Sequence, residues 1–358
     1  MFVYIHVPFC NCICNYCDFS KVIYSDKFSS KYLDNLELEI KNRYKGEEVK
    51  SIFIGGGTPT SLSDEEFKRL LDITNIFNKS ESIEFSIESN VECLNSYKIS
   101  LMKSYGVNRV SLGVQSFDDK NLKELNRHHN KDMVFNSVKM LKDSGFSNIS
   151  IDLIYGVNNN IDIVSRDIDY FLELNIPHVS CYSLIIEDNT LFGINNRNFI
   201  DDDIDKDMYE LISNKLSSNG YNHYEISNYS KPGYESVHNL NYWYNGYYYG
   251  FGLGAVSFIS DYRISNTKNL TKYLNGDYLD SSIYEDKSVR MSNDIILGLR
   301  TIKGVNLLKF ENKYGVKLTD VYDINDLINT HKLIVLDGYL SINKDYIYLS
   351  NDILINFI

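Results

Sequence analysis

The chain has 358 residues, enough for one large domain or for a large and a small one, and 43% of them are hydrophobic, so a sizeable core can be buried. The formal net charge of −12 argues against broad electrostatic binding to nucleic acid or to anionic membranes, and we expect no nucleic-acid partner. No apolar run is long enough for a transmembrane segment and the N-terminus lacks a basic secretory signal, so we expect a cytoplasmic protein.

Strands and helices alternate through the first 200 residues. Apolar strands are predicted at residues 2–7, 49–57, 83–89, 109–116, 148–156 and 178–186. Helices are predicted at residues 27–44, 63–77, 95–104, 118–125, 131–143 and 162–174. Ser63 and Glu66 have the capping-box spacing at the start of the second helix. This alternation predicts an α/β fold in which six β–α repeats form a parallel sheet covered by helices.

The pattern changes after residue 200, and we predict three domains. Residues 1–200 form the β–α core, residues 201–285 a Tyr- and Gly-rich extension, and residues 286–358 a C-terminal unit. Within the last unit, residues 288–315 are typical of a helix–turn–helix, and residues 338–350 are predicted to form a hairpin. Helices followed by a small hairpin indicate a smaller α+β, winged-helix-like unit.

Four of the six cysteines lie within "CNCICNYC", residues 10–17. Cys10, Cys14 and Cys17 have the spacing C-x3-C-x2-C. Disulfides are rare in the cytosol, and structural zinc sites usually combine two separated ligand pairs, of which only one is present. Three close thiolates favour an iron–sulfur cluster with one open iron, although the thiols alone leave zinc as an alternative.

Polar residues and glycines follow or end several predicted strands. They are the run Gly55–Gly57, Glu88, Gln115 and Asp152. Because the carboxyl ends of parallel strands meet at one edge, we expect these residues to converge with the cysteines at one mouth. Glycines allow close approach of a ligand, so we expect exposed amides in this run to hold a polar group.

These segments together resemble the radical S-adenosylmethionine (SAM) superfamily. The segments "YIHVPFC", "CNYCDFS", "IFIGGGTPT", "RVSLGVQSF", "ISIDLIYG" and "HNLNYW" resemble its coproporphyrinogen-dehydrogenase-like branch, especially the HemW-type haem chaperones. The resemblance implies a partial (β/α)6 barrel in which Cys10, Cys14 and Cys17 hold a [4Fe–4S] cluster, with Cys12 as a spare thiol. Its open iron would bind SAM, whose reductive cleavage gives methionine and a 5′-deoxyadenosyl radical.

The resemblance also implies the residues that contact the ligands. The matching SAM positions are Tyr4, Tyr16, Gly56, Gly57, Thr58, Glu88, Gln115, Arg127, Asp152 and Ile185. The matching haem segment, "HNLNYW", supplies His238, Asn239, Tyr242 and Trp243. Imidazole is a good axial ligand for haem iron, and the two aromatic rings could flank a porphyrin.

Three functions compete on this basis. The favoured one is a haem chaperone that binds haem and transfers it to haem-requiring proteins. The alternative is an oxygen-independent coproporphyrinogen III dehydrogenase, but that enzyme typically carries a further cysteine where Cys17 is here followed by "DFS". A nucleic-acid-modifying radical enzyme is disfavoured by the acidic charge. If SAM is cleaved, a one-electron donor such as flavodoxin or ferredoxin is needed, and the sequence leaves open whether such turnover occurs.

Overall fold

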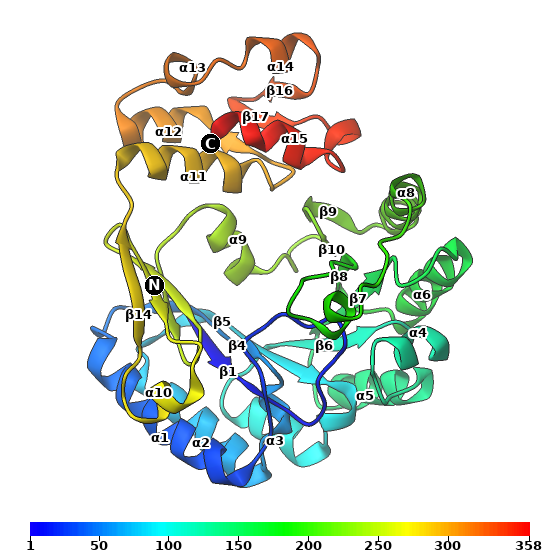
Figure 1. Cartoon of the computed structure of the whole chain (residues 1–358), viewed down its shortest axis with the longest axis vertical. Coiled ribbons are helices and arrows are strands. Elements are labelled where there is room, and N and C mark those ends of the chain that lie inside the picture. The colour runs from blue at the N-terminus through cyan, green and yellow to red at the C-terminus, as the bar shows by residue number, and fades with distance from the viewer.

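The computed structural model describes residues 1–358 and is built around six parallel strands (Figure 1). The strands, in spatial order, are β1 (Phe2–Val7), β4 (Val49–Gly56), β5 (Lys79–Asn90), β6 (Arg109–Gln115), β7 (Asn148–Tyr155) and β8 (His178–Ser183). Each pairs in parallel with the next. The predicted α/β architecture with a partial (β/α)6 barrel is thereby confirmed.

Helices cover the outer face of these strands (Figure 1). They are α1 (Asp26–Arg43), α2 (Asp64–Ile73), α3 (Ser96–Ser104), α4 (Asp119–Glu124), α5 (Lys131–Asp143) and α6 (Ile161–Leu174). Short 3-10 helices η1 (Pro59–Ser61), η2 (Thr74–Ile76) and η3 (Val91–Cys93) follow strands or helices in this part of the chain. The predicted capping box at α2 is present, because Ser63 accepts from the Glu66 amide and the Glu66 carboxylate accepts from the Ser63 amide.

Alternate residues of each strand face opposite sides of the sheet, and the two sides differ in polarity. Val110 and Leu112 of β6 belong to the apolar core beneath the helices. Between them, Ser111 donates to Asp152 of the neighbouring strand at 3.3 Å. On the same inner side, Ser150 of β7 is hydrogen-bonded to His178 of β8 at 2.7 Å. The interior of the barrel is therefore polar, whereas its outer wall is an apolar packing surface.

Residues 201–285 add strands to both edges of this sheet. After α7 (Leu191–Ile194) and α8 (Asp202–Ser218), β9 (Asn222–Glu225) and β10 (Asn228–Ser230) extend the β8 edge. After α9 (Val237–Trp243), β11 (Tyr248–Phe251) pairs with β1, and β12 (Val256–Ile259), β13 (Tyr262–Asn266), α10 (Leu270–Leu274) and β14 (Leu279–Tyr284) follow. One sheet of 12 strands results, and α9 lies in the chain between its two extended edges.

The C-terminal residues form a separate layer above α9 in the view of Figure 1. Its elements are α11 (Lys287–Gly298), β15 (Val305–Asn306), α12 (Leu307–Tyr314), α13 (Leu318–Val321), α14 (Asn325–Asn329), β16 (Leu333–Leu336), β17 (Tyr339–Ile342), η4 (Lys344–Tyr346), α15 (Ser350–Leu354) and η5 (Ile355–Phe357). These elements enclose an apolar core of their own that includes Ile295, Phe310 and Leu340. Helices around a three-stranded sheet agree with the predicted α+β unit.

The C-terminal hairpin lies upstream of its predicted position. The prediction of a hairpin over residues 338–350 is wrong, because the hairpin is β16–β17 and the following residues form η4 and α15. Asp337 and Gly338 connect the two strands with φ of +48° and +77°, as a two-residue turn of the Asp-Gly type requires. No helix in the chain is both long and apolar enough to cross a membrane.

Candidate functional site

The carboxyl ends of the parallel strands surround a cavity beside the cysteine loop. The predicted residues that line it are Cys10, Cys14, Cys17, Tyr16, Gly56, Gly57, Thr58, Glu88, Gln115, Arg127 and Asp152. The other lining residues are Cys12, Ile13, Phe19, Lys21, Ser89, Asn90 and Gly113. The expectation that strand-end residues and cysteines converge at one mouth is therefore confirmed.

The cysteine loop is attached to the barrel at its start and in its middle. It runs between two short strands, β2 (Phe9–Cys10) and β3 (Val22–Ile23), which pair in parallel. The Phe9 carbonyl accepts from the Thr58 amide at 2.8 Å. In the middle of the loop, Asn15 donates to the Glu124 carbonyl at 2.7 Å. The loop is thus held against β4 on one side and the end of α4 on the other.

Each of the three cysteines in the C-x3-C-x2-C spacing has a different polar neighbour. Thr58 Oγ1 donates to Cys10 Sγ at 3.8 Å and accepts from Asn90 Nδ2 at 2.9 Å. Arg127 Nη1 donates to Cys14 Sγ at 3.7 Å. The Lys21 ammonium donates to the Cys17 carbonyl. Donors and cations beside sulfur favour the thiolate, the form that binds metal.

Burial opposes that ionisation in the absence of metal. It raises the pKa of the Cys10 thiol to about 12, against the hydrogen bond from Thr58. It also raises the pKa of Cys17, against the charge of Lys21. Because metal ligation requires deprotonated sulfur, loading of the site must release protons.

The donor set fits an iron–sulfur cluster better than a single ion. No group of three or more His, Cys, Asp or Glu side chains lies close enough together to hold one metal ion. In a cluster, by contrast, cysteines bind separate irons, so the thiols need not converge on one point. Cys12 is engaged elsewhere, since its sulfur accepts from Asn126 Nδ2 at 3.1 Å and lies 3.4 Å from His128 Nε2.

The glycine turn is packed more tightly than expected. The Gly56 amide donates to Glu88 Oε2 at 3.1 Å, and the Gly57 amide donates to the Val7 carbonyl at 2.8 Å. The expectation of exposed amides that hold a ligand is therefore wrong at both positions. A Cβ at Gly57 would lie 2.8 Å from the Pro8 and Phe9 carbonyl oxygens. The glycine thus allows β4 to approach the start of the cysteine loop.

Two half-buried carboxylates that line the cavity and one buried guanidinium determine the charge at this point. Burial and the nearby charge of Asp152 raise the pKa of Glu88 to about 8, against the Gly56 amide and Arg109. Burial also raises the pKa of Asp152, which Ser180, Arg109 and Ser111 oppose. Arg109 is 2% exposed and forms no salt bridge. Its positive charge therefore acts on both carboxylates from within the barrel.

Two of the predicted SAM positions do not line the cavity. Tyr4 lies inside the barrel, where its hydroxyl is hydrogen-bonded to His6 Nδ1 at 3.0 Å. Ile185 follows β8 and is 65% exposed. Conversely, Asn90 and Lys21 line the cavity and were not predicted. Asn90 could have been found from the sequence, because it lies two residues after Glu88 and so faces the same side of the strand.

The segment "HNLNYW" forms α9, which lies at the opposite ends of the strands. Glu84, near the middle of β5, accepts from the Val237 and His238 amides at 3.0 and 2.9 Å. A carboxylate at this position satisfies free amides and interacts favourably with the helix dipole. His238 is hydrogen-bonded to Ser51, near the amino end of β4. This end of the barrel is the one away from the cysteines.

The two faces of α9 have different surroundings. His238 and Tyr242 face the barrel, where His238 is 1% exposed. Its Nδ1 is 2.9 Å from Ser51 Oγ and its Nε2 is 2.9 Å from Tyr242 Oη. Trp243 lies on another side and lines a separate cavity next to the C-terminal unit. Asn239 donates its amide to the helix cap, Ser236, so the four predicted haem residues do not share one surface.

Comparison with known proteins agrees with the barrel and the cysteine loop. Residues 4–170 match the Radical SAM superfamily, the class that binds a [4Fe–4S] cluster together with SAM. Among solved structures, coproporphyrinogen III oxidase (HemN) from Escherichia coli has a TM-score of 0.88 at 22% identity. That similarity covers 99% of this chain and 89% of HemN and concerns the fold.

Similarity to curated sequences is more specific. The heme chaperone HemW of Lactococcus lactis is 40% identical over 91% of this chain and 89% of that protein. HemW of Bacillus subtilis is 37% identical over 89% of this chain and 88% of that protein. HemW of Escherichia coli is 36% identical over 78% of this chain and 77% of that protein. The chain belongs to the HemW family of the radical SAM superfamily.

Proposed function

We propose that this protein is a haem chaperone, which binds haem and delivers it to haem-requiring proteins. The observation that carries the proposal is the similarity to proteins named heme chaperone HemW, at 40% identity across nearly the whole chain. A similarity over 91% of the chain must include the "HNLNYW" helix, and the superfamily match over residues 4–170 includes the cysteine loop. The alternative, a coproporphyrinogen III dehydrogenase, is supported by shared fold alone.

For the cluster, we propose Cys10, Cys14 and Cys17 as the ligands. Arg127 and Lys21 lie beside Cys14 and Cys17 and would offset the negative charge of the thiolates. When bound, the cluster would supply the electron for a reductive cleavage of SAM. Tyr16, Thr58, Glu88, Gln115, Arg127 and Asp152 would orient SAM in the cavity, which Gly56 and Gly57 also line.

For haem, we propose that α9 contributes to the site. His238 could serve as an axial ligand only after leaving one of its two hydrogen-bond partners, because each ring nitrogen is already engaged and one of them must be free to bind iron. Burial and the charge of Arg109 lower the pKa of His238 to about 3, so its imidazole is neutral and chemically able to bind iron. Trp243 already lines a cavity and requires no such rearrangement.

The decisive experiment compares haem binding with turnover on one anaerobic preparation. The protein, reconstituted with iron and sulfide, is titrated with haem and then assayed with coproporphyrinogen III, SAM and dithionite. We expect saturable haem binding and no protoporphyrinogen IX. Formation of protoporphyrinogen IX would replace the chaperone proposal by the dehydrogenase. If SAM is cleaved without that product, a flavodoxin or ferredoxin is the expected electron donor.

A further inference from the structure

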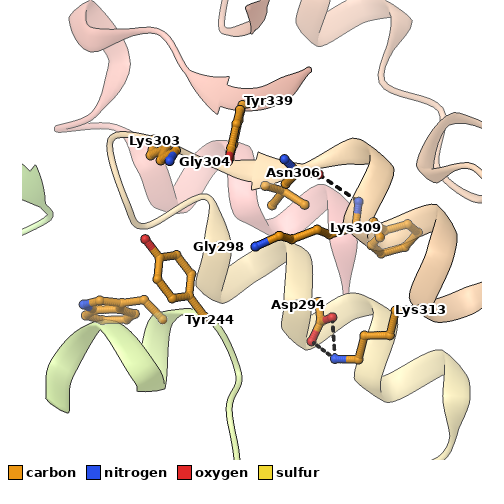
Figure 2. Close-up of a pocket in the computed structure, with 12 residues that line it drawn as sticks. Tyr244, Asp294, Gly298, Lys303, Gly304, Asn306, Lys309, Lys313 and Tyr339 are labelled. Atoms are coloured by element: carbon orange, nitrogen blue, oxygen red, sulfur yellow. Dashed lines mark hydrogen bonds and ion pairs between the residues drawn. The ribbon is translucent and has the colours of Figure 1, made fainter. Parts of the chain in front are cut away.

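A cavity of about 510 Å³ lies between the end of α9 and the C-terminal unit (Figure 2). We call it the α9 groove and define it by Trp243, Tyr244, Lys303, Lys309, Phe310 and Tyr339. These residues come from three segments that are distant in the chain. A cavity of this volume is in the range of sites for drug-sized ligands, which is roughly 300–1,000 Å³.

Four of the twelve residues that line the α9 groove are aromatic. Trp243 and Tyr244 end α9 on one side, and Phe310 and Tyr339 belong to the C-terminal unit. Figure 2 shows the Tyr244 ring extending from the α9 segment toward the C-terminal unit, and it is 53% exposed. Aromatic side chains at such a position offer a flat apolar surface to a planar ring system.

Two lysines of the α9 groove have no carboxylate partner. Lys313 is paired with Asp294 at 2.7 Å. Lys303 and Lys309 form no salt bridge, and the Lys303 ammonium lies 4.7 Å from the centre of the Tyr339 ring. Figure 2 shows Lys309 reaching into the space between α9 and the C-terminal strand. In a chain with a net charge of −12, two unpaired cations at one cavity form a local anion-attracting surface.

The two sides of the α9 groove are joined by direct hydrogen bonds. Asn245, just after α9, donates to Asp294 of α11 at 2.8 Å. Asp294 also accepts from Lys313 of α12. The α9 groove is therefore already formed without a ligand, which reduces the entropic cost of binding.

We propose that the α9 groove binds haem through its propionates, with the carboxylates at Lys303 and Lys309 and the porphyrin against Trp243 and Tyr244. The proposal rests on the proposed haem function and assigns the C-terminal unit a part in it. A planar apolar ring with two carboxylates on one edge matches aromatic walls that carry two unpaired ammonium groups. His238 does not line the α9 groove, so haem bound here is not ligated by that imidazole.

The test measures affinity for haem and for haem dimethyl ester, in which both carboxylates are blocked. The variant is Lys303→Glu/Lys309→Glu in the full chain. The matched control is Lys317→Glu/Lys344→Glu, which makes the same charge change at two exposed lysines of the same unit outside the cavity. All four positions are exposed, so we expect all variants to fold, as thermal denaturation will verify.

We expect the Lys303/Lys309 variant to bind haem about tenfold more weakly, since each exposed ion pair contributes up to about 1 kcal/mol. The wild type should discriminate against the dimethyl ester by a similar factor, and the Lys317/Lys344 control should bind haem normally. Equal haem affinity in both variants, or equal affinity of the wild type for haem and its ester, would overturn the assignment while leaving the chaperone function intact. Failure of the wild type to bind haem would overturn the proposed function itself.

Discussion

The two ends of the barrel are built in different ways. At the carboxyl ends of the strands, the cysteine cavity is lined by residues at the ends of successive strands, and hydrogen bonds of 2.9 and 3.1 Å hold some of its side chains. At the amino ends, α9 presents one buried face to the barrel and one to the α9 groove, whose lysines are exposed. The β–α repeats of the barrel position the residues of the cysteine cavity, whereas α9 and the C-terminal unit, which lie outside those repeats, form the α9 groove.

The largest expected effect is on cluster assembly, which should depend only on residues at the carboxyl ends of the strands. Cys10→Ala, Cys14→Ala and Cys17→Ala should each abolish the [4Fe–4S] cluster, because each removes the only thiolate for one iron. Cys12→Ala is the matched control and should retain the cluster, since that sulfur is held by Asn126 and His128. Iron and sulfide content and visible absorbance after anaerobic reconstitution measure the result. Loss of the cluster in the Cys12 variant alone would show that the ligands are wrongly assigned.

The tight packing at Gly57 gives the second test. Gly57→Ala places a methyl group 2.8 Å from the Pro8 and Phe9 carbonyls, which should cost roughly 1–3 kcal/mol and displace the start of the cysteine loop. SAM binding should fall sharply as a result. In the control, Gly220→Ala, the methyl meets nothing within 4 Å, and φ is +81°. The control should lose some stability but keep its SAM affinity, as isothermal titration can establish. Normal SAM affinity in Gly57→Ala would contradict the packing argument.

At the other end of the barrel, replacement of His238 should lower the free energy of unfolding. His238→Ala leaves Ser51 and Tyr242 without their partner in a site that is 1% exposed. We expect the free energy of unfolding to fall by about 2–4 kcal/mol, measured by urea denaturation. Val237→Ala on the exposed side of the same helix should change it by less than about 0.5 kcal/mol. Equal, small effects would mean that α9 is not anchored through His238.

The free energy of unfolding should also depend on pH through the titration of His238. Its folded pKa is lowered by burial to about 3, below the unfolded value of about 6.5. The unfolded chain therefore binds a proton that the folded chain does not, and stability falls as pH decreases below 6.5. Between pH 7 and 5.5, His238→Asn should lose about 1 kcal/mol less than the wild type. Identical losses would show that His238 does not titrate as a buried group.

The smallest expected effect separates ligand binding from folding in the α9 groove. Tyr244 is 53% exposed, so Tyr244→Ala should change the unfolding free energy by less than about 0.5 kcal/mol. Haem affinity should nevertheless fall about fivefold through loss of ring contact. Fluorescence-quenching titration measures the affinity. An unchanged affinity would remove Tyr244 from the haem surface, and cluster content serves as the control because that site is at the other end.

The barrel and the cysteine cavity could be predicted from the sequence, because both follow from local repeats. Alternating strand and helix patterns fix the sheet, and strand-end residues such as Glu88 and Asp152 must then meet at one edge. The orientation of the His238 side chain toward the barrel could not be predicted, because it depends on a hydrogen bond to Ser51, which is far away in the chain. The C-terminal hairpin was misplaced because both of its strands were sought in residues 338–350, whereas the Asp337–Gly338 turn puts the first strand before that segment. The α9 groove needs three distant segments, and no local pattern marks it.

The position of α9 in the chain has a mechanical consequence. The strands before α9 extend one edge of the sheet, and the strands after it extend the other. Helix α9 therefore lies in the segment that connects the two edges of the open barrel. Hydrogen bonds to Glu84 and Ser51 hold this helix against the two central strands β5 and β4. The segment that joins the two added edges is therefore fixed at the middle of the sheet.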